Sequence, residues 1–157
     1  MLARDTITEI ADELAQADRA HGTIPRITAR HPEASVDDAY TIQGIWRDKN
    51  LAAGRRLVGR KIGLTSRAMQ QATGITEPDY GVIFADTVHS TGAAIAVDQF
   101  SNVRVEVELA FLLRAPLAGP DRSIFDVLRA TEYVSPASSR VPCWCSLLAS
   151  HATPMAG

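Results

Sequence analysis

The chain has 157 residues, of which 46% are hydrophobic and 22% are charged. This length and composition are typical of one globular domain with a sizeable core. The formal net charge of −2 gives no global attraction for nucleic acid, and the apolar runs are too short to cross a bilayer. The N-terminal stretch lacks the apolar segment of a signal peptide, so we expect a soluble, cytoplasmic protein with no nucleic-acid or membrane partner.

Two helices are predicted in the N-terminal third of the chain. Residues 6–18 carry apolar side chains at helical spacing, and Thr6 with Glu9 has the pattern of a capping box at the start. The second helix is expected to begin after Ser35 and to be closed by Gly54. The side chains expected on the buried face of this second helix are Ala39, Ile42, Ile45 and Trp46.

From residue 57 onward the pattern changes to β structure interrupted by short helices. Segments 57–64 and 103–113 are predicted strands, and the second of them is the clearest in the sequence. Thr65 is the expected cap of a short helix over 66–73, and another short helix is expected over 123–128. Helices followed by irregular β structure predict the α+β fold class.

Two glutamates, Glu106 and Glu108, are candidate metal ligands on the predicted strand 103–113. Alternate residues of a strand share a face, so their carboxylates would lie roughly 7 Å apart. Hard oxygen donors at this spacing can share a Mg²⁺ or Mn²⁺ ion when a third ligand folds in. A solvated strand face, with Arg104 paired to a glutamate, explains the same pattern, and the residues alone favour that plainer interpretation.

Lys61 and Asp79 are candidate proton-transfer residues. Lys61 stands between Gly59 and Gly63 on the first predicted strand, and glycines allow another group to approach the backbone closely. A lysine beside a metal ion can exchange protons. Asp79 is expected in a turn over 77–81, where it could act as a base or anchor a neighbouring group. An exposed lysine and a turn aspartate bonded to its own backbone are the commoner uses of such residues.

Several short motifs follow one another in a fixed order between about residue 5 and Ala137. They are Asp38-Ala-Tyr-Thr-Ile-Gln43, Gly59-Arg-Lys-Ile-Gly-Leu-Thr-Ser66 with Ala68-Met-Gln70, Glu77-Pro-Asp-Tyr-Gly81, Arg104-Val-Glu-Val-Glu-Leu-Ala-Phe111, Phe125-Asp-Val127 and Ala130-Thr-Glu-Tyr-Val134. Together they resemble the 2-keto-4-pentenoate hydratases of the fumarylacetoacetate hydrolase superfamily, with the 2-oxo-hept-4-ene-1,7-dioate hydratases as the most similar branch. The resemblance covers about the first half of a family chain.

The resemblance implies a fold, an activity and a set of site residues. The fold would be N-terminal helices followed by part of a mixed β barrel or roll of the fumarylacetoacetate hydrolase type. The activity would be that of a hydro-lyase of aromatic catabolism, which adds water to a 2-hydroxy-dienoate, with 2-oxo-hept-4-ene-1,7-dioate as the expected substrate. Glu106 and Glu108 would bind the Mg²⁺ or Mn²⁺ ion that holds the 2-oxo acid. Lys61 and Asp79 would transfer protons, and homo-oligomers are the family expectation.

The C-terminal stretch departs from the family. We expect a hydratase part over 1–137 and a non-family tail without regular structure over 138–157, because Ser138-Ser-Arg140 stands where the family places Leu-Glu and its third metal ligand. A shifted reading frame would explain this tail, and so would a natural splice or deletion variant. The missing ligand predicts impaired activity. Two other functions stay open: a 2-oxo-acid decarboxylase of the 4-oxalocrotonate type, and a non-catalytic fragment that associates with full-length subunits.

Overall fold

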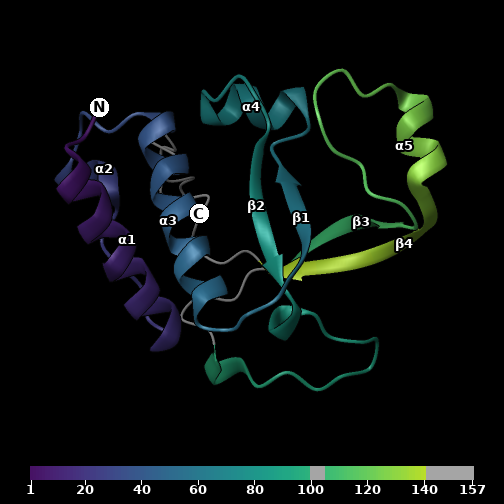
Figure 1. Cartoon of the computed structure of the whole chain (residues 1–157), viewed down its shortest axis with the longest axis horizontal. Coiled ribbons are helices and arrows are strands. Elements are labelled where there is room, and N and C mark those ends of the chain that lie inside the picture. The colour runs from purple at the N-terminus through teal and green to yellow at the C-terminus, as the bar shows by residue number, and fades with distance from the viewer. Residues whose placement is uncertain (100–104, 141–157) are drawn as a thin grey trace. The chain divides into compact units, whose positions relative to one another are not determined.

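The computed structural model describes residues 1–99 and 105–140, which form an α+β structure, as predicted (Figure 1). The described part divides into two compact units, one from α1 to η2 and the other from β3 to β4. The first unit contains α1 (Arg4–Arg19), α2 (Ile27–Arg30), α3 (Val36–Ala52), β1 (Leu57–Gly63), α4 (Arg67–Thr73), β2 (Asp79–Phe84), η1 (Ala85–Thr87) and η2 (Val97–Gln99). The second unit contains β3 (Val105–Leu113), α5 (Ile124–Ala130) and β4 (Thr131–Arg140).

The core of the first unit lies between α1 and α3, which run side by side (Figure 1). Buried side chains at helical spacing on both helices meet the end of β2, where the Phe84 ring packs edge-on against Trp46 at a centroid distance of 5.5 Å. The side chains of this core are Ile7, Ile10, Ala11, Leu14, Ala15, Ile27, Ile42, Trp46 and Phe84. Across residues 1–99 and 105–140, none of the helices has the length and apolarity needed to cross a membrane.

The structure confirms the predicted start of one helix and corrects the predicted caps of two others. Ser35 caps α3 through a capping box with Asp38, as its position before the helix suggested. The predicted box of Thr6 and Glu9 is wrong, because α1 begins at Arg4 after Ala3 and has no side-chain cap. Ser66, not Thr65, caps α4 by accepting a 3.2 Å hydrogen bond from the Met69 amide.

In the first unit, β1 and β2 form an antiparallel pair. The register places Gly63 opposite Asp79 and Lys61 opposite Gly81. Asp79 is therefore the first residue of a strand and not a turn residue, which corrects the turn expected over 77–81. A carboxylate at this position is held by the ladder of β1, so its place is fixed by strand pairing.

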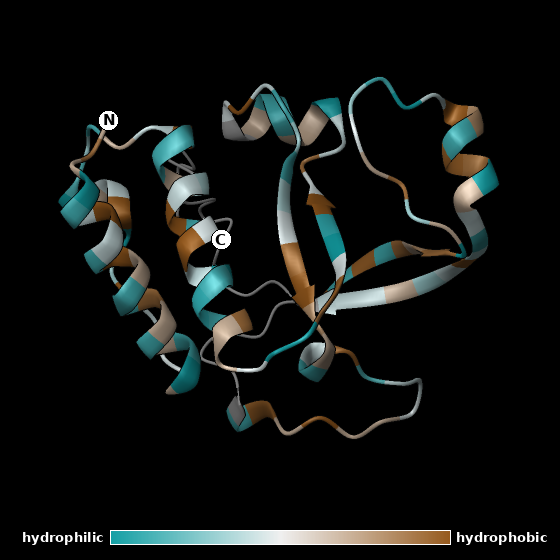
Figure 2. Cartoon of the chain, in the orientation of Figure 1, coloured by the Kyte–Doolittle hydropathy of each residue, from teal (hydrophilic) through white to brown (hydrophobic). Residues whose placement is uncertain are grey.

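In the second unit, β3 and β4 form an antiparallel ribbon connected through α5. Figure 2 shows brown, hydrophobic stretches along β3 and a paler β4. Because β4 runs to Arg140, the expectation that 138–157 lacks regular structure is wrong for residues 138–140. Residues 141–157 lie outside the described part of the chain, as do Val103 and Arg104 at the start of the predicted strand 103–113.

Candidate functional site

Lys61 lies on a face of the β1–β2 pair that carries three glycines. Gly59 and Gly63 flank it on β1, and Gly81 lies opposite it on β2. Directly paired residues of an antiparallel ladder share a face, so Asp79, opposite Gly63, also belongs here. We call this the glycine face, made of Gly59, Lys61, Gly63, Asp79, Gly81 and Ile83. The two ionisable side chains are diagonal neighbours on it, roughly 7–8 Å apart by standard sheet geometry and within reach of a lysine chain.

The Asp79 carboxylate occupies the space that a side chain at position 63 would need. A Cβ built on Gly63 would overlap Asp79 Oδ1 and would lie 3.2 Å from Asp79 Cγ. At Gly81 an added Cβ meets no atom within 4 Å. The glycine face therefore holds one seated carboxylate and an open area beside Lys61, which is an arrangement suited to proton transfer with a bound molecule.

Two residues of α3, Tyr40 and Gln43, hold the start of β2 from its other face. The rings of Tyr40 and Tyr80 stack at a centroid distance of 4.4 Å with 9° between their planes. Gln43 Nε2 donates a 3.2 Å hydrogen bond to the Tyr80 carbonyl oxygen. Burial raises the pKa of the Tyr40 hydroxyl.

A small cavity of about 40 Å³ adjoins the Tyr40–Tyr80 contact and is lined by Val36, Tyr40, Ile75, Glu77, Pro78 and Asp79. Sequence reasoning gave Tyr40 and Gln43 no role, although both belong to the motif 38–43.

Glu106 and Glu108 share one face of β3, as their alternation predicted. Ser139 lies opposite Glu106 on β4, and its hydroxyl donates a 3.3 Å hydrogen bond to Glu108 Oε1. Glu108 is half-buried, whereas Glu106 is exposed. Figure 1 shows the β3–β4 ribbon that carries both residues. Two carboxylates on one rigid strand, one of them oriented by a hydroxyl, form a donor set suited to a hard divalent cation.

The two glutamates would be an incomplete set of protein ligands by themselves. Among residues 1–99 and 105–140, no group of three His, Cys, Asp or Glu side chains is placed to hold one ion. Mg²⁺ usually keeps several waters and takes one or two carboxylates together with oxygens of its substrate. The donor chemistry of Glu106 and Glu108 therefore fits such an ion, with the other positions left to water, substrate or a further ligand.

The four predicted site residues fall into two pairs. Lys61 and Asp79 are brought together on the glycine face of the first unit. Glu106 and Glu108 are brought together on β3 in the second unit.

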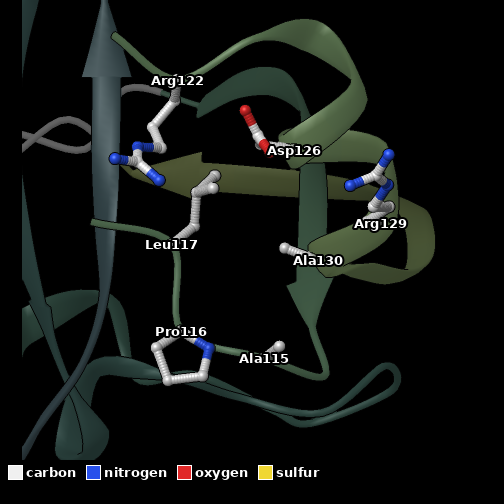
Figure 3. Close-up of a pocket in the computed structure, with 7 residues that line it drawn as sticks. All are labelled: Ala115, Pro116, Leu117, Arg122, Asp126, Arg129 and Ala130. Carbon is white, nitrogen blue, oxygen red and sulfur yellow. The ribbon is translucent and has the colours of Figure 1, made fainter. Parts of the chain in front are cut away.

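A larger cavity, of about 200 Å³, lies beside α5 in the second unit. Figure 3 shows Arg122 and Arg129 on opposite sides of it, with Leu117 between them. It is lined by Ala115, Pro116, Leu117, Arg122, Asp126, Arg129 and Ala130. The cavity adjoins the Leu113 end of β3, and the rise of a strand places that end roughly 23 Å from Glu106. It is therefore separate from the carboxylate pair.

Comparison with known proteins gives a consistent set of relatives. The chain is 44% identical over 145 residues to a 2-oxo-hept-4-ene-1,7-dioate hydratase of Escherichia coli, a match that covers 92% of this chain and 54% of the relative. It is 39% identical over 143 residues to a 2-hydroxypent-2,4-dienoate hydratase of Pseudomonas putida, covering 88% of this chain and 64% of the relative. A 2-keto-4-pentenoate hydratase of Paraburkholderia xenovorans is 38% identical over 140 residues, covering 87% and 52%. The chain thus spans about half the length of most of these relatives.

Similar solved structures point to the same group of proteins. The 4-oxalocrotonate decarboxylase from Pseudomonas putida G7, complexed with magnesium and adipate, superposes with a TM-score of 0.85 at 28% sequence identity. The match covers 92% of this chain and 55% of the decarboxylase. A structure of the same decarboxylase with calcium and acetate gives the same TM-score. No model of a known protein family matches the chain.

Proposed function

Because the chain belongs to the family of 2-keto-4-pentenoate and 2-oxo-hept-4-ene-1,7-dioate hydratases, we propose that it carries part of the active site of a hydro-lyase. The reaction is the addition of water to a 2-hydroxy-dienoate or its 2-oxo-4-enoate tautomer, in aromatic catabolism. The observation that carries the proposal is that Lys61 and Asp79 are diagonal neighbours on the glycine face. The proposed substrate is 2-oxo-hept-4-ene-1,7-dioate, and the 44% identity to a hydratase of that compound supports it.

Glu106 and Glu108 are the proposed ligands of a Mg²⁺ or Mn²⁺ ion. The neighbouring decarboxylase structures contain magnesium or calcium, which supports a divalent cation in this family of folds. A bound cation would supply Lewis-acid polarisation of the substrate carbonyl group. Ser139 orients the Glu108 carboxylate through its hydrogen bond, which reduces the freedom that the side chain would lose on binding the ion.

Lys61 and Asp79 are the proposed proton-transfer residues. Ketonisation with a proton delivered to C5, at the far end of the 2-hydroxy-dienoate, gives a conjugated 2-oxo-3-enoate. Water then adds at C4 and loses one proton, while C3 gains one. Both steps need a donor or acceptor beside a flat conjugated chain. The open backbone area around Gly81 leaves room for such a chain next to Lys61.

The wider architecture belongs to the same proposal. We propose that the described elements form part of a mixed β barrel or roll and that the protein assembles as a homo-oligomer. The TM-score of 0.85 over 55% of the decarboxylase chain supports the shared fold. The proposed division is a hydratase part over 1–137 and a tail over 138–157 that does not follow the family.

The test is loss of the ultraviolet absorbance of a 2-hydroxy-dienoate in the presence of Mg²⁺. We expect turnover well below that of a full-length hydratase, because two carboxylates hold the ion less strongly than three. Lys61→Met and Glu106→Gln should abolish this turnover, and Glu132→Gln, which removes an exposed carboxylate of β4, should leave it unchanged. Turnover that survives EDTA or Lys61→Met would contradict the proposal, as would a chain that neither turns over the dienoate nor binds Mn²⁺.

A decarboxylase of the 4-oxalocrotonate type is the alternative within the same fold. The similarity to that decarboxylase is 28%, against 44% to the hydratase, so the hydratase activity is favoured. Release of CO₂ from 4-oxalocrotonate, without consumption of a dienoate, would reverse this preference.

A second candidate function is association with a full-length hydratase subunit. The observation that favours it is the apolar face of the β3–β4 ribbon, which we define as Val105, Val107, Leu109 and Phe111; their exposed fractions run from 55% to 90%. Apolar surface of this extent on a strand commonly marks an interaction site. Capture of this chain by a tagged full-length hydratase, lost on Val107→Lys, is the expected result. Equal capture of the Val107→Lys variant would contradict it.

A further inference from the structure

We infer that Gly63 is a positioning residue, which seats the Asp79 carboxylate on the face of β1 that carries Lys61. The inference rests on the proposed role of Asp79 in proton transfer. It concerns a residue that touches neither substrate nor metal and acts only through the side chain opposite it.

The position of the Asp79 carboxylate is defined by its distances from a Cβ atom built on Gly63. From the position of a Cβ on Gly63, Asp79 Cγ lies at 3.2 Å and Oδ2 at 3.6 Å, while Oδ1 would overlap the added atom. The carboxylate therefore lies against the backbone of β1, in the volume that any other residue at position 63 would fill. Real Cβ atoms do not tolerate such an overlap, so either the Asp79 side chain or one of the strands must move.

The backbone of β1 does not itself require glycine at this position. The described glycines with positive φ are Gly54, Gly74, Gly92 and Gly119, so Gly63 has a backbone conformation open to other residues. Glycine within a strand normally weakens it, and such a position often marks a close approach by another group. Here the approaching group is a carboxylate with a proposed chemical role.

The strand that carries Asp79 is held from the other side by α3. The Tyr40–Tyr80 stack and the Gln43 hydrogen bond to the Tyr80 carbonyl fix the backbone next to Asp79. With that backbone fixed, the overlap between a methyl group at position 63 and the Asp79 carboxylate would be relieved most directly by rotation of the Asp79 side chain. Rotation would carry the carboxylate away from its place diagonal to Lys61, and proton transfer requires hydrogen-bond reach.

The requirement is specific to Gly63 among the glycines of this face. An added Cβ on Gly59 would make an ordinary 3.6 Å contact with Ile83 Cδ1. An added Cβ on Gly81 would meet no atom within 4 Å. Gly81→Ala is therefore a matched control, since it makes the same change on the same face of the same ladder without touching the carboxylate.

The test is an NMR measurement of the Asp79 side-chain rotamer, from the three-bond couplings of its Cγ to the backbone nitrogen and carbonyl carbon. The wild-type chain and Gly81→Ala should show the same single rotamer, and Gly63→Ala should show a different or averaged one. Gly63→Ala should also lower the urea midpoint, and it should do so much less in an Asp79→Ala background. Unchanged couplings in Gly63→Ala would overturn the inference.

The double variant keeps the test decisive when Gly63→Ala does not fold. Folding of Gly63→Ala/Asp79→Ala would then support the seat, because the overlapping atoms have been removed. Failure of the double variant as well would overturn it. The NMR test uses no substrate or metal, so it is independent of the hydratase assay. If Gly63→Ala changes the Asp79 couplings but the wild-type chain shows no hydratase activity, only the proposed function is rejected. If the wild-type chain is active but Gly63→Ala leaves the couplings unchanged, only the positioning role is rejected.

Discussion

Glu108 and Glu106 differ in what surrounds them, although they share one face of β3. Glu108 is half-buried and accepts a hydrogen bond from Ser139, whereas Glu106 is exposed. A ligand that is already oriented loses less freedom when it binds an ion. Of the two proposed ligands, Glu108 should therefore contribute more to metal affinity.

The first prediction concerns Mn²⁺ affinity, measured by electron paramagnetic resonance of the free ion. Glu108→Gln and Ser139→Ala should each weaken binding by at least about tenfold, because losing an orienting partner typically costs about 10- to 100-fold. Ser135→Ala is the control, since Ser135 is a serine of β4 whose hydroxyl bonds the Pro136 carbonyl and no glutamate. Equal weakening by Ser135→Ala and Ser139→Ala would argue against the orienting role.

The first turn of helix α3 contains a buried aspartate, Asp38, with 1% of its surface exposed. Asp38 Oδ2 accepts hydrogen bonds from the amide and hydroxyl of Ser35, and Oδ1 accepts one from the Leu2 amide. The Ser35 amide, with smaller contributions from the Ser35 hydroxyl, Leu2 and the N-terminal amine, lowers the pKa of Asp38. Asp38 thus ties the first residues of the chain to the start of α3.

The second prediction is the pH dependence that follows from this lowered pKa. A carboxyl with a lower pKa in the folded state stabilises the fold at pH values above its unfolded pKa, near 3.9. That contribution is lost as the pH falls through the folded-state pKa. In urea titrations Asp38→Asn should therefore destabilise the chain at neutral pH, and the difference from wild type should shrink below about pH 4. Asp37→Asn, an exposed change in the same turn, should show neither effect.

Arg55 connects three elements at the other end of the first unit. Its guanidinium pairs with Asp86 of η1 through Nε and Nη2, and its Nη1 lies 2.8 Å from a carboxylate oxygen of Asp18 in α1. It also lies 4.3 Å from the centre of the Phe84 ring. Because the side chain is only 21% exposed, these contacts are partly shielded from water.

The third prediction is that Arg55→Ala lowers the free energy of unfolding by about 1–3 kcal/mol, since it removes a partly buried ion-pair network and a cation–π contact. Arg55→Lys should recover only part of this loss, because an ammonium group cannot make the paired contacts to Asp86. Arg47→Ala is the comparison, as it removes a more exposed ion pair with Asp48 and should cost less than about 1 kcal/mol. Chemical denaturation of the four proteins provides the measurement, and equal losses for Arg47→Ala and Arg55→Ala would contradict the prediction.

On the scale of the whole molecule, apolar side chains are distributed very differently in the two units. The first unit buries a contiguous cluster between α1, α3 and the end of β2. Among residues 105–140 the one buried hydrophobic side chain is Ala130, at the end of α5, while Val107 of β3 is 90% exposed. The chain matches about half the length of its relatives, so in a complete family protein other segments are available to cover such a face.

The fourth prediction is that the chain binds the dye ANS through this apolar face. Val107→Lys should reduce the fluorescence of bound ANS by about half or more, because a charge within the apolar face interrupts the continuous apolar surface. Val97→Lys is the control, since Val97 is 71% exposed in η2, an element of the first unit. Neither change should shift the thermal midpoint. An equal decrease in fluorescence for both variants would show that the ribbon is not the binding surface.

Local rules predicted the elements well and their exact beginnings less well. Helical spacing of apolar residues was enough for α1 and α3, because the same side chains that define the pattern make the core. The cap of α4 was placed one residue early, at Thr65, since Thr and Ser can both cap a helix and the choice depends on the backbone path. Asp79 was expected in a turn, and pairing with β1 made it part of a strand.

The sequence by itself determined the family, the α+β class and the four candidate site residues, because these depend on residue identity and on spacing along the chain. It also placed Glu106 and Glu108 on one face, since alternation is a property of a single strand. Only the tertiary structure revealed that Gly63 makes room for Asp79, that Ser139 orients Glu108 and that Tyr40 and Gln43 hold the start of β2. Each of these relations joins residues 16 to 40 positions apart, and the register or packing that brings them together is fixed by the fold and by no local pattern.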